Sequence, residues 1–305
     1  MSEIRPTRKY ADSHSIFTKF EPWEGVVPAY FDVTPYGSFI RRSFYDLPDY
    51  NAEHFHSKLL LTINVDHPFR IPMLEKLWKE EYFEWIDLLE AIDSARESFT
   101  MVELGAGHGR WIVQAGVILR NQKNIPFHLI GVEAESNHYK MMYQHFIDNG
   151  LNPNEHMLIQ AAVNDVEEPV YFTEGHSKEW WGQAIIPTKD TNFGNWPKAI
   201  VTEIPGHTIS KILEKVKYVD LMDIDIQGAE AKAIRSSTSA LDSKVRRIHI
   251  GTHSHEIENE LYEVFSKLDW ICCNNFPCLS TVETNFGPIT FNDGVQTWIN
   301  PHVHV

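Results

Sequence analysis

A glycine-rich turn with two nearby acids is the strongest chemical signal in the sequence. Three glycines fall within Val102-Glu-Leu-Gly-Ala-Gly-His-Gly109, between an apolar run and a helical pattern. Such a turn lets the backbone approach a ligand closely and aims the first N–H groups of the following helix at it. One acid precedes the turn and a second ends the next apolar run. The pattern predicts a cofactor bound by Glu103, Gly105, Ala106, Gly107, Gly109 and Glu133.

The charges around this turn distinguish between two cofactors. A nicotinamide-dinucleotide fingerprint needs a small residue where Arg110 stands, and Glu103 would oppose a pyrophosphate. S-adenosylmethionine carries an ammonium and a sulfonium and no phosphate, and its ribose hydroxyls can donate to an acid such as Glu133. We therefore predict S-adenosylmethionine as the cofactor, with a nicotinamide-dependent oxidoreductase as the alternative.

A second group of candidates, Asp225, Glu230 and His253, is suited to proton transfer. Methyl transfer to an alcohol needs a base that takes the hydroxyl proton, or a metal ion that acidifies it. Asp225 ends an apolar run, with Asp223 on the same face two residues earlier, and an unpartnered carboxylate there would be costly. His253 can titrate near neutrality. Glu230 either reaches the site or stabilises the N-terminus of its helix.

The sequence leaves a metal ion undecided. His249, His253 and His255 share strand parity, but their spacing matches no zinc signature. Mg²⁺ or another divalent ion could bind Asp225 and a neighbouring acid, because Mg²⁺ accepts one or two carboxylates plus water.

Alternating strands and helices must position these residues. Apolar runs predict strands at 99–104, 127–133, 157–163, 218–226, 247–252 and 270–274. Helical patterns fall at 73–96, 111–120, 136–148 (capped by Ser136), 229–236 and 255–268 (capped by Ser254). This alternation predicts an α/β fold, a Rossmann-like doubly wound parallel sheet covered on both faces.

Two regions depart from this alternation of strands and helices. Residues 1–98 are aromatic, proline-rich and irregular before one helix, and we expect them to form an N-terminal extension that covers the acceptor side. Residues 99–305 would form the cofactor-binding domain, with a β-rich insertion at about 166–210 and a terminal antiparallel β addition from 286 onward.

Composition limits the class of protein. Hydrophobic residues make up 43% and charged residues 23% of the 305, which is typical of globular chains. A formal charge of −15 argues against binding nucleic acid. The cysteines cluster at 272, 273 and 278, no signal peptide is visible, and no apolar run is long enough to cross a bilayer. We expect a soluble cytoplasmic protein that could form a homo-oligomer.

Several segments together resemble the FkbM family of S-adenosylmethionine-dependent methyltransferases. They are the glycine turn, Gly131-Val-Glu, Ala161-Ala-Val-Asn-Asp and Asp225-Ile-Gln-Gly-Ala-Glu230. The chain departs from the family by carrying Gln227 where a glutamate is usual, and by Ile248-His-Ile-Gly-Thr-His-Ser, where many members end the strand with an acid and a histidine. The resemblance implies that the turn holds the methionine part, Glu133 the ribose, and residues 162–165, with Ala162 and Asn164, the adenine. It also implies O-methylation, often of sugars or of hydroxyls on natural products.

The resulting expectation is an O-methyltransferase acting on a hydroxylated small molecule, a sugar, nucleotide-linked sugar or glycan precursor. Another natural product as acceptor, or an inactive interaction module, remains an alternative. Two arginine pairs, Arg41-Arg42 and Arg246-Arg247, could hold phosphates of a nucleotide-linked sugar or lie solvated on the surface. Glu179-Trp180-Trp181-Gly182 could offer an indole face to a sugar ring or pack within the insertion.

Overall fold

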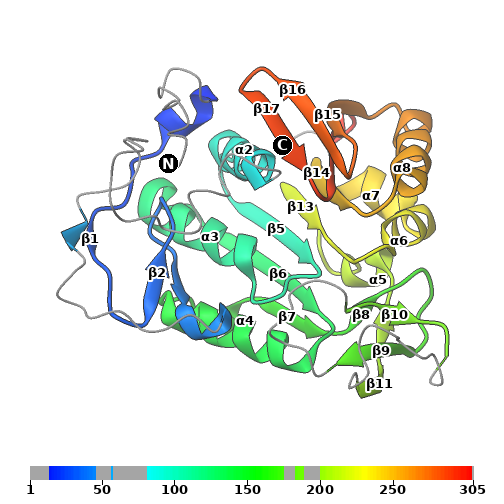
Figure 1. Cartoon of the computed structure of the whole chain (residues 1–305), viewed down its shortest axis with the longest axis horizontal. Coiled ribbons are helices and arrows are strands. Elements are labelled where there is room, and N and C mark those ends of the chain that lie inside the picture. Colours follow the sequence, from blue (N-terminus) through cyan, green and yellow to red (C-terminus); the bar gives the residue numbers. More distant parts are fainter. Residues whose placement is uncertain (1–13, 46–55, 58–80, 175–182, 189–199, 304–305) are drawn as a thin grey trace, which may run out of the picture.

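A seven-stranded sheet forms the centre of the molecule (Figure 1). The computed structural model describes residues 14–45, 56–57, 81–174, 183–188 and 200–303. The strand order is β15-β18-β14-β13-β5-β6-β7. All neighbouring pairs from β14 to β7 are parallel, whereas β18 runs antiparallel to both its neighbours. The strands are β5 (Phe99–Leu104), β6 (Phe127–Glu133), β7 (Met157–Gln160), β13 (Leu221–Ile224), β14 (Arg247–Thr252), β15 (Ile271–Phe276) and β18 (Gly294–Ile299).

Helices cover both faces of this sheet, because successive strand residues point to opposite sides. Phe99 and Met101 of β5 pack with α2 and α3, while Val102 and Leu104 pack in the core on the other face. The fold is therefore the predicted doubly wound α/β sheet. One face carries α2 (Glu81–Ser94), α3 (Arg110–Ile118) and α4 (Ser136–Asp148); the other carries α5 (Ile209–Ile212), α6 (Glu230–Ser236), α7 (Thr238–Lys244) and α8 (His255–Lys267) (Figure 1).

Most predicted elements are present, with local differences. The predicted strand at 157–163 is broken, because β8 (Ala162–Val163) leaves the central sheet and pairs with β12 (Gly206–His207). The cap of α4 is Glu135 and not Ser136: its carboxylate accepts the N–H groups of residues 137 and 138, both at 2.7 Å. Of the helix predicted at 73–96, residues 73–80 lie outside the described residues. The short helices α5 and α7 were not predicted.

The insertion is β-rich and the C-terminal segment is antiparallel, as predicted. The insertion contributes β9 (Val170–Glu174), β10 (Ile185–Ile186) and β11 (Ile200–Ile204), in the order β10-β9-β11. Near the C-terminus, a hairpin of β16 (Ser280–Thr284) and β17 (Gly287–Phe291) precedes β18, which inserts between β14 and β15. The segment 179–182, with its two tryptophans, lies outside the described residues.

The described part of the N-terminal extension packs on the α2, α3 and α4 side. Its elements are the 3₁₀ turns η2 (Ser15–Lys19) and η3 (Arg42–Tyr45) and the strands β1 (Gly25–Val26), β2 (Phe31–Val33), β3 (Phe39–Arg41) and β4 (His56–Ser57). Tyr82 of α2 accepts from the His14 N–H at 2.6 Å, and Asn149 after α4 exchanges hydrogen bonds with the Phe39 backbone. Elsewhere in the described residues, the π-helical segment η5 (Leu119–Lys123) continues α3, and the 3₁₀ turn η6 (Pro153–Glu155) precedes β7.

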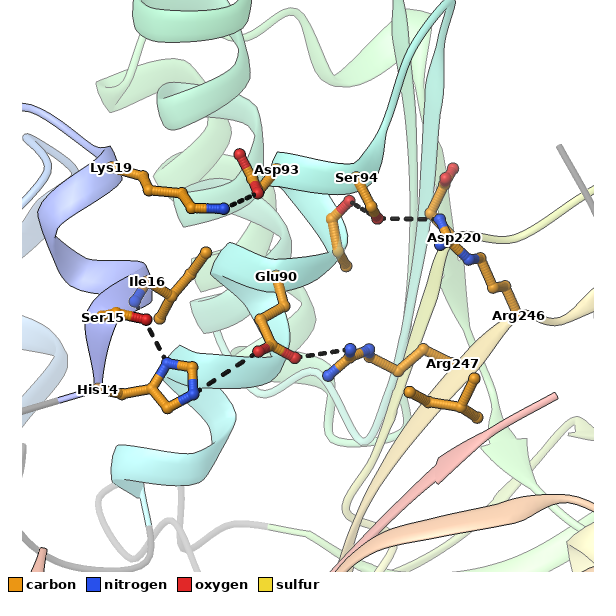
Figure 2. Close-up of a pocket in the computed structure, with 12 residues that line it drawn as sticks. His14, Ser15, Ile16, Lys19, Glu90, Asp93, Ser94, Asp220, Arg246 and Arg247 are labelled. Carbon is orange, nitrogen blue, oxygen red and sulfur yellow. Dashed lines mark hydrogen bonds and ion pairs between the residues drawn. The ribbon is translucent and has the colours of Figure 1, made fainter. Parts of the chain in front are cut away.

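Both arginine pairs have partners within the protein. Arg247 donates to Asp87 at 2.5 Å. Arg247 also donates to Glu90 at 2.7 Å, and Arg246 donates to Ser94 (Figure 2). Glu90, Ser94 and the two arginines line a polar pocket between η2, α2 and the starts of β13 and β14, at the opposite edge of the sheet from the strands' carboxyl ends. Arg41 and Arg42 pair with Asp148 and Asp32. Three of these four guanidinium groups pair with carboxylates and the fourth, that of Arg246, donates to a hydroxyl, so neither pair is arranged to bind a phosphate by both of its arginines.

Among the described residues, no helix combines the length and the apolar character needed to cross a bilayer.

Candidate functional site

A cavity lies at the carboxyl ends of β5, β6 and β13, where ligands bind in open parallel sheets. The glycine turn, the acid that ends β6 and the acid that follows β13 all line it. Parallel strands bring these distant parts of the sequence to one edge. The lining residues that were predicted to bind the cofactor or act in catalysis are Gly105, Gly107, Glu133, Ala162 and Asp225.

The turn packs directly against the end of β13. Gly105 has a φ of +79°, and a Cβ built there would lie 1.7 Å from the carbonyl oxygen of Asp225. Only glycine fits, both because of the left-handed backbone and because of this contact. The close approach places the turn beside the Asp225 carboxylate.

Glu133 presents its carboxylate to the cavity. One oxygen accepts the Gly107 N–H at 2.7 Å and the other accepts the Glu135 N–H at 2.7 Å. Burial raises its pKa to about 7, although the two backbone donors oppose the shift. Each carboxylate oxygen has a second lone pair, so the group can still accept from a ligand's hydroxyls.

Glu103 has a different position from the one expected. Its two oxygens accept the N–H groups of Trp111 and Ile112 at 3.1 and 3.0 Å, at the start of α3, and the residue is 3% exposed. It is not among the residues that line the cavity. Burial raises the pKa of its carboxyl group to about 8, although the two backbone donors oppose the shift. Because this group already accepts the N–H groups at the start of α3, where a pyrophosphate would bind, the turn disfavours a dinucleotide.

The rest of the cavity wall is formed by residues that were not predicted to lie there. Ala106, Gly109 and Asn164 are not among the lining residues; Gly109 instead caps α3 with a φ of 73°. The wall includes His138, Phe172, Gln183, Ile185 and Gln227. Three of these belong to the insertion, and the only sequence signal for them was its β-rich, partly apolar character.

Asp225, Glu230 and His253 lie together beside the cavity. The Nδ1 atom of His253 is 2.9 Å from the Oε1 atom of Glu230, and its Nε2 atom is 3.3 Å from the Oδ1 atom of Asp225. Glu230 is fully buried and also accepts the N–H groups of Ile226 and Gly228. The side chain of Asp225 is 48% exposed and accepts from Gln227 at 2.8 Å. The structure thus brings together all three predicted catalytic residues.

His253 is held as a cation. Burial alone would lower its pKa, but the hydrogen bonds and charges of Asp225 and Glu230 raise it to about 10. A ring that is protonated at neutral pH cannot accept a further proton. Asp225 is therefore the better placed of the two to receive a proton from an acceptor.

This ionisation makes a prediction about stability. The pKa of His253 rises from 6.5 to about 10 on folding, so its stabilising effect is complete below about pH 6.5 and is lost as the pH rises through 10. We expect the unfolding free energy of the wild type to fall by an amount on the order of a few kcal/mol across this window. Urea unfolding at several pH values would measure it. The unfolding free energy of His253→Gln should not show this fall. The same pH dependence of the unfolding free energy in both proteins would contradict the assignment.

A doubly wound sheet with a glycine turn and acids at the carboxyl ends of its strands is the architecture of α/β enzymes that bind a nucleoside cofactor. The model of the methyltransferase FkbM domain matches residues 104–274, more than half of the chain. The protein belongs to the FkbM methyltransferase family.

The chain is also similar to individual known proteins. A protein of Jannaschia sp. (strain CCS1) with a provisional methyltransferase name is 26% identical over 207 residues, which are 67% of this chain and 74% of the relative. Methyltransferase FkbM from Methylobacillus flagellatus KT has a TM-score of 0.41 and 14% identity, covering 68% of this chain and 45% of its own. Precorrin-6y C5,15-methyltransferase from Geobacter metallireducens GS-15 has a TM-score of 0.41 and 10% identity, covering 73% and 90%.

The protein is thus an S-adenosylmethionine-dependent methyltransferase, and the oxidoreductase and inactive-module alternatives fall away. The residues present fit that cofactor: Glu133 has lone pairs for a ribose diol, and Glu103 occupies the helix N-terminus that a phosphate would need.

Proposed function

We propose that this methyltransferase acts on a hydroxyl group of a small molecule. The observation that carries the proposal is the half-exposed Asp225 carboxylate on the wall of the cofactor cavity, within 3.3 Å of His253. S-adenosylmethionine supplies an electrophilic methyl group when bound. A hydroxyl is a poor nucleophile until its proton is removed, and a carboxylate is a suitable acceptor for that proton.

The three residues have different roles in this proposal. Asp225 orients the acceptor hydroxyl and takes its proton. His253 fixes the carboxylate, since its protonated ring lies between Asp225 and Glu230. Glu230 is buried and holds the ring from the opposite side. His253 and Glu230 are therefore positioning residues, and Asp225 is the catalytic residue.

We also propose which residues of the cavity wall contact the methionine portion, the ribose and the adenine of the cofactor. Gly105 and Gly107 approach the methionine portion, and Glu133 accepts from the ribose hydroxyls. The adenine lies against Ala162 and the apolar cluster that Phe172 forms with it. We propose no divalent metal ion at this cluster, because both nitrogens of His253 already face carboxylates.

The proposed acceptor is a sugar, a nucleotide-linked sugar or a glycan precursor, and another hydroxylated natural product is the second candidate. The resemblance of the motifs to FkbM methyltransferases supports a sugar. The formal charge of −15 disfavours a polyanion. We propose that the enzyme works in the cytoplasm, a reducing compartment suited to its three free thiols.

Glu133→Gln tests the cofactor assignment. The amide would turn an N–H donor toward Gly107 or Glu135, both of which donate, and would remove the charge that a diol prefers. We expect S-adenosylhomocysteine affinity, measured by calorimetry, to fall by about tenfold or more. In the wild type the affinity should increase as the pH rises through about 7, where Glu133 ionises. Equal affinity and equal pH dependence in both proteins would contradict this role.

An acceptor assay tests the reaction. Transfer of labelled methyl from S-adenosylmethionine should occur to hydroxylated acceptors, sugars and nucleotide-linked sugars first, and not to matched acceptors in which the hydroxyl is replaced by hydrogen. Amine acceptors of the same shape provide the comparison. Labelling of the amines alone would overturn the O-methylation proposal while leaving the family assignment intact.

A further inference from the structure

A row of ionisable side chains crosses the sheet on the face that α2 covers. Asp223 of β13 is in register with Glu103 of β5 on one side and with His249 of β14 on the other. Because side chains alternate along a strand, these three share the face of Met101 and Leu221, which pack in the core with α2 and α3. The helix adds Glu84 and the buried Asp87 to the same region.

Most charges in this region are compensated. Asp87 accepts from Arg247 at 2.5 Å and Thr297 at 2.6 Å, and it lies 2.6 Å from His249. Glu103 accepts two backbone N–H groups. Arg110 forms two hydrogen bonds with Glu81. Arg247, Arg110 and His249 are thus each held by another acid, although the charges of His249 and Arg110 partly offset the rise in the pKa of Glu84.

Asp223 and Glu84 are the exceptions. Asp223 is 6% exposed and Glu84 is half-buried, and within the described chain neither side chain has a hydrogen bond or ion pair. Burying carboxylates without a partner is costly. Burial and the neighbouring acids raise the pKa of both groups well above their ordinary values. A bound cation would remove this cost.

The geometry is that of a three-residue ligand set. Glu84, Asp223 and His249 each offer a ligand atom, and these atoms lie within 4.8 Å of one another. The Nδ1 atom of His249 faces Asp87, which leaves Nε2 for a ligand. A histidine held through one nitrogen by a carboxylate while the other binds a metal is a recurrent arrangement in metal sites. The three residues come from α2, β13 and β14, so the scaffold is rigid.

We propose that Glu84, Asp223 and His249 bind a divalent transition-metal ion. Zn²⁺ and Mn²⁺ fit the donor set, because both accept imidazole together with carboxylates. The ion would neutralise the two unpartnered carboxylates and leave coordination positions for water. This site is separate from the cluster of Asp225, Glu230 and His253, where both ring nitrogens of the histidine already face acids.

Metal titration of the full-length chain tests the proposal. After dialysis against a chelator, calorimetry with Zn²⁺ and with Mn²⁺ should show one ion bound per chain, with Mg²⁺ binding more weakly. Glu84→Gln and Asp223→Asn should each weaken binding by about tenfold or more. Asp225→Asn and His253→Gln are the matched controls and should bind the ion as the wild type does. Circular dichroism and S-adenosylhomocysteine binding check that each variant is folded.

Two results of this titration would overturn the proposal. If the wild type binds neither ion, the two carboxylates are simply protonated and the proposal is wrong. If binding is lost in Asp225→Asn or His253→Gln and kept in Glu84→Gln, the ion belongs to the other cluster and the proposal is equally wrong. Should Asp223→Asn fail to fold, Glu84→Gln decides the matter, because Glu84 lies at a half-buried helical position.

Discussion

Replacing Asp225 with asparagine is expected to reduce methyl transfer by about tenfold or more, with little change in cofactor affinity. The amide keeps the shape and the hydrogen-bonding capacity of the side chain but cannot take a proton. It also weakens the charge that faces His253, 3.3 Å away. Turnover with saturating S-adenosylmethionine and the affinity for S-adenosylhomocysteine would measure the two effects separately.

Asp293→Asn provides the matched control. The Asp293 carboxylate lies 3.9 Å from the same Nε2 atom of His253, yet the residue is not among those that line the cofactor cavity. The same chemical change there should leave turnover within about twofold of the wild type. Unchanged turnover in Asp225→Asn, or an equal loss in both variants, would remove Asp225 from the mechanism.

Gly105→Ala is expected to have the largest effect on the folded protein. The added methyl group would lie 1.7 Å from a backbone carbonyl oxygen, and the residue would keep a φ of +79° that alanine disfavours. Either the turn or the end of β13 must move, so we expect a loss of stability above about 3 kcal/mol and loss of S-adenosylhomocysteine binding. Urea unfolding and calorimetry would measure the two quantities.

Gly150→Ala separates backbone strain from the steric overlap. Gly150 has a φ of +66°, but the nearest atom to an added Cβ is the end of the flexible Arg120 side chain at 3.3 Å. This variant should lose only about 1 kcal/mol and should bind the cofactor normally. If Gly105→Ala behaved like Gly150→Ala, the tight contact between the turn and β13 would not control the cavity.

The parallel strands and the helices between them could be predicted because their patterns are local. The strands β5 and β13 were recognisable as continuous apolar runs because both of their faces are buried. The helical spacing in α4 and α8 reflects which face of each helix is buried. The glycine turn and Glu133 were recognisable for a similar reason, because the turn comes directly after a predicted strand and Glu133 is the last residue of the next one. Since carboxyl ends of parallel strands meet at one edge, the sequence also placed Asp225 and His253 in one region.

Partners that come from distant parts of the chain could not be predicted. Glu103 was expected to face the cofactor, but its carboxylate accepts from the first turn of α3. Arg247 was considered for phosphate, but α2 supplies Asp87 and Glu90 to it. In both cases the choice depends on which donor or acid the packing brings within hydrogen-bond distance.

The sequence by itself determined the doubly wound sheet, the phosphate-free cofactor and the acids near it, because local periodicity and strand-end chemistry carry that information. Only the tertiary structure decided the protonation and the pairing of the buried groups. His253 is a cation because Asp225 and Glu230 meet it from two sides. Glu84 and Asp223 face each other with His249 because α2 crosses two strands far from it in sequence. Burial and neighbouring charge set these properties, and both arise from packing between distant elements.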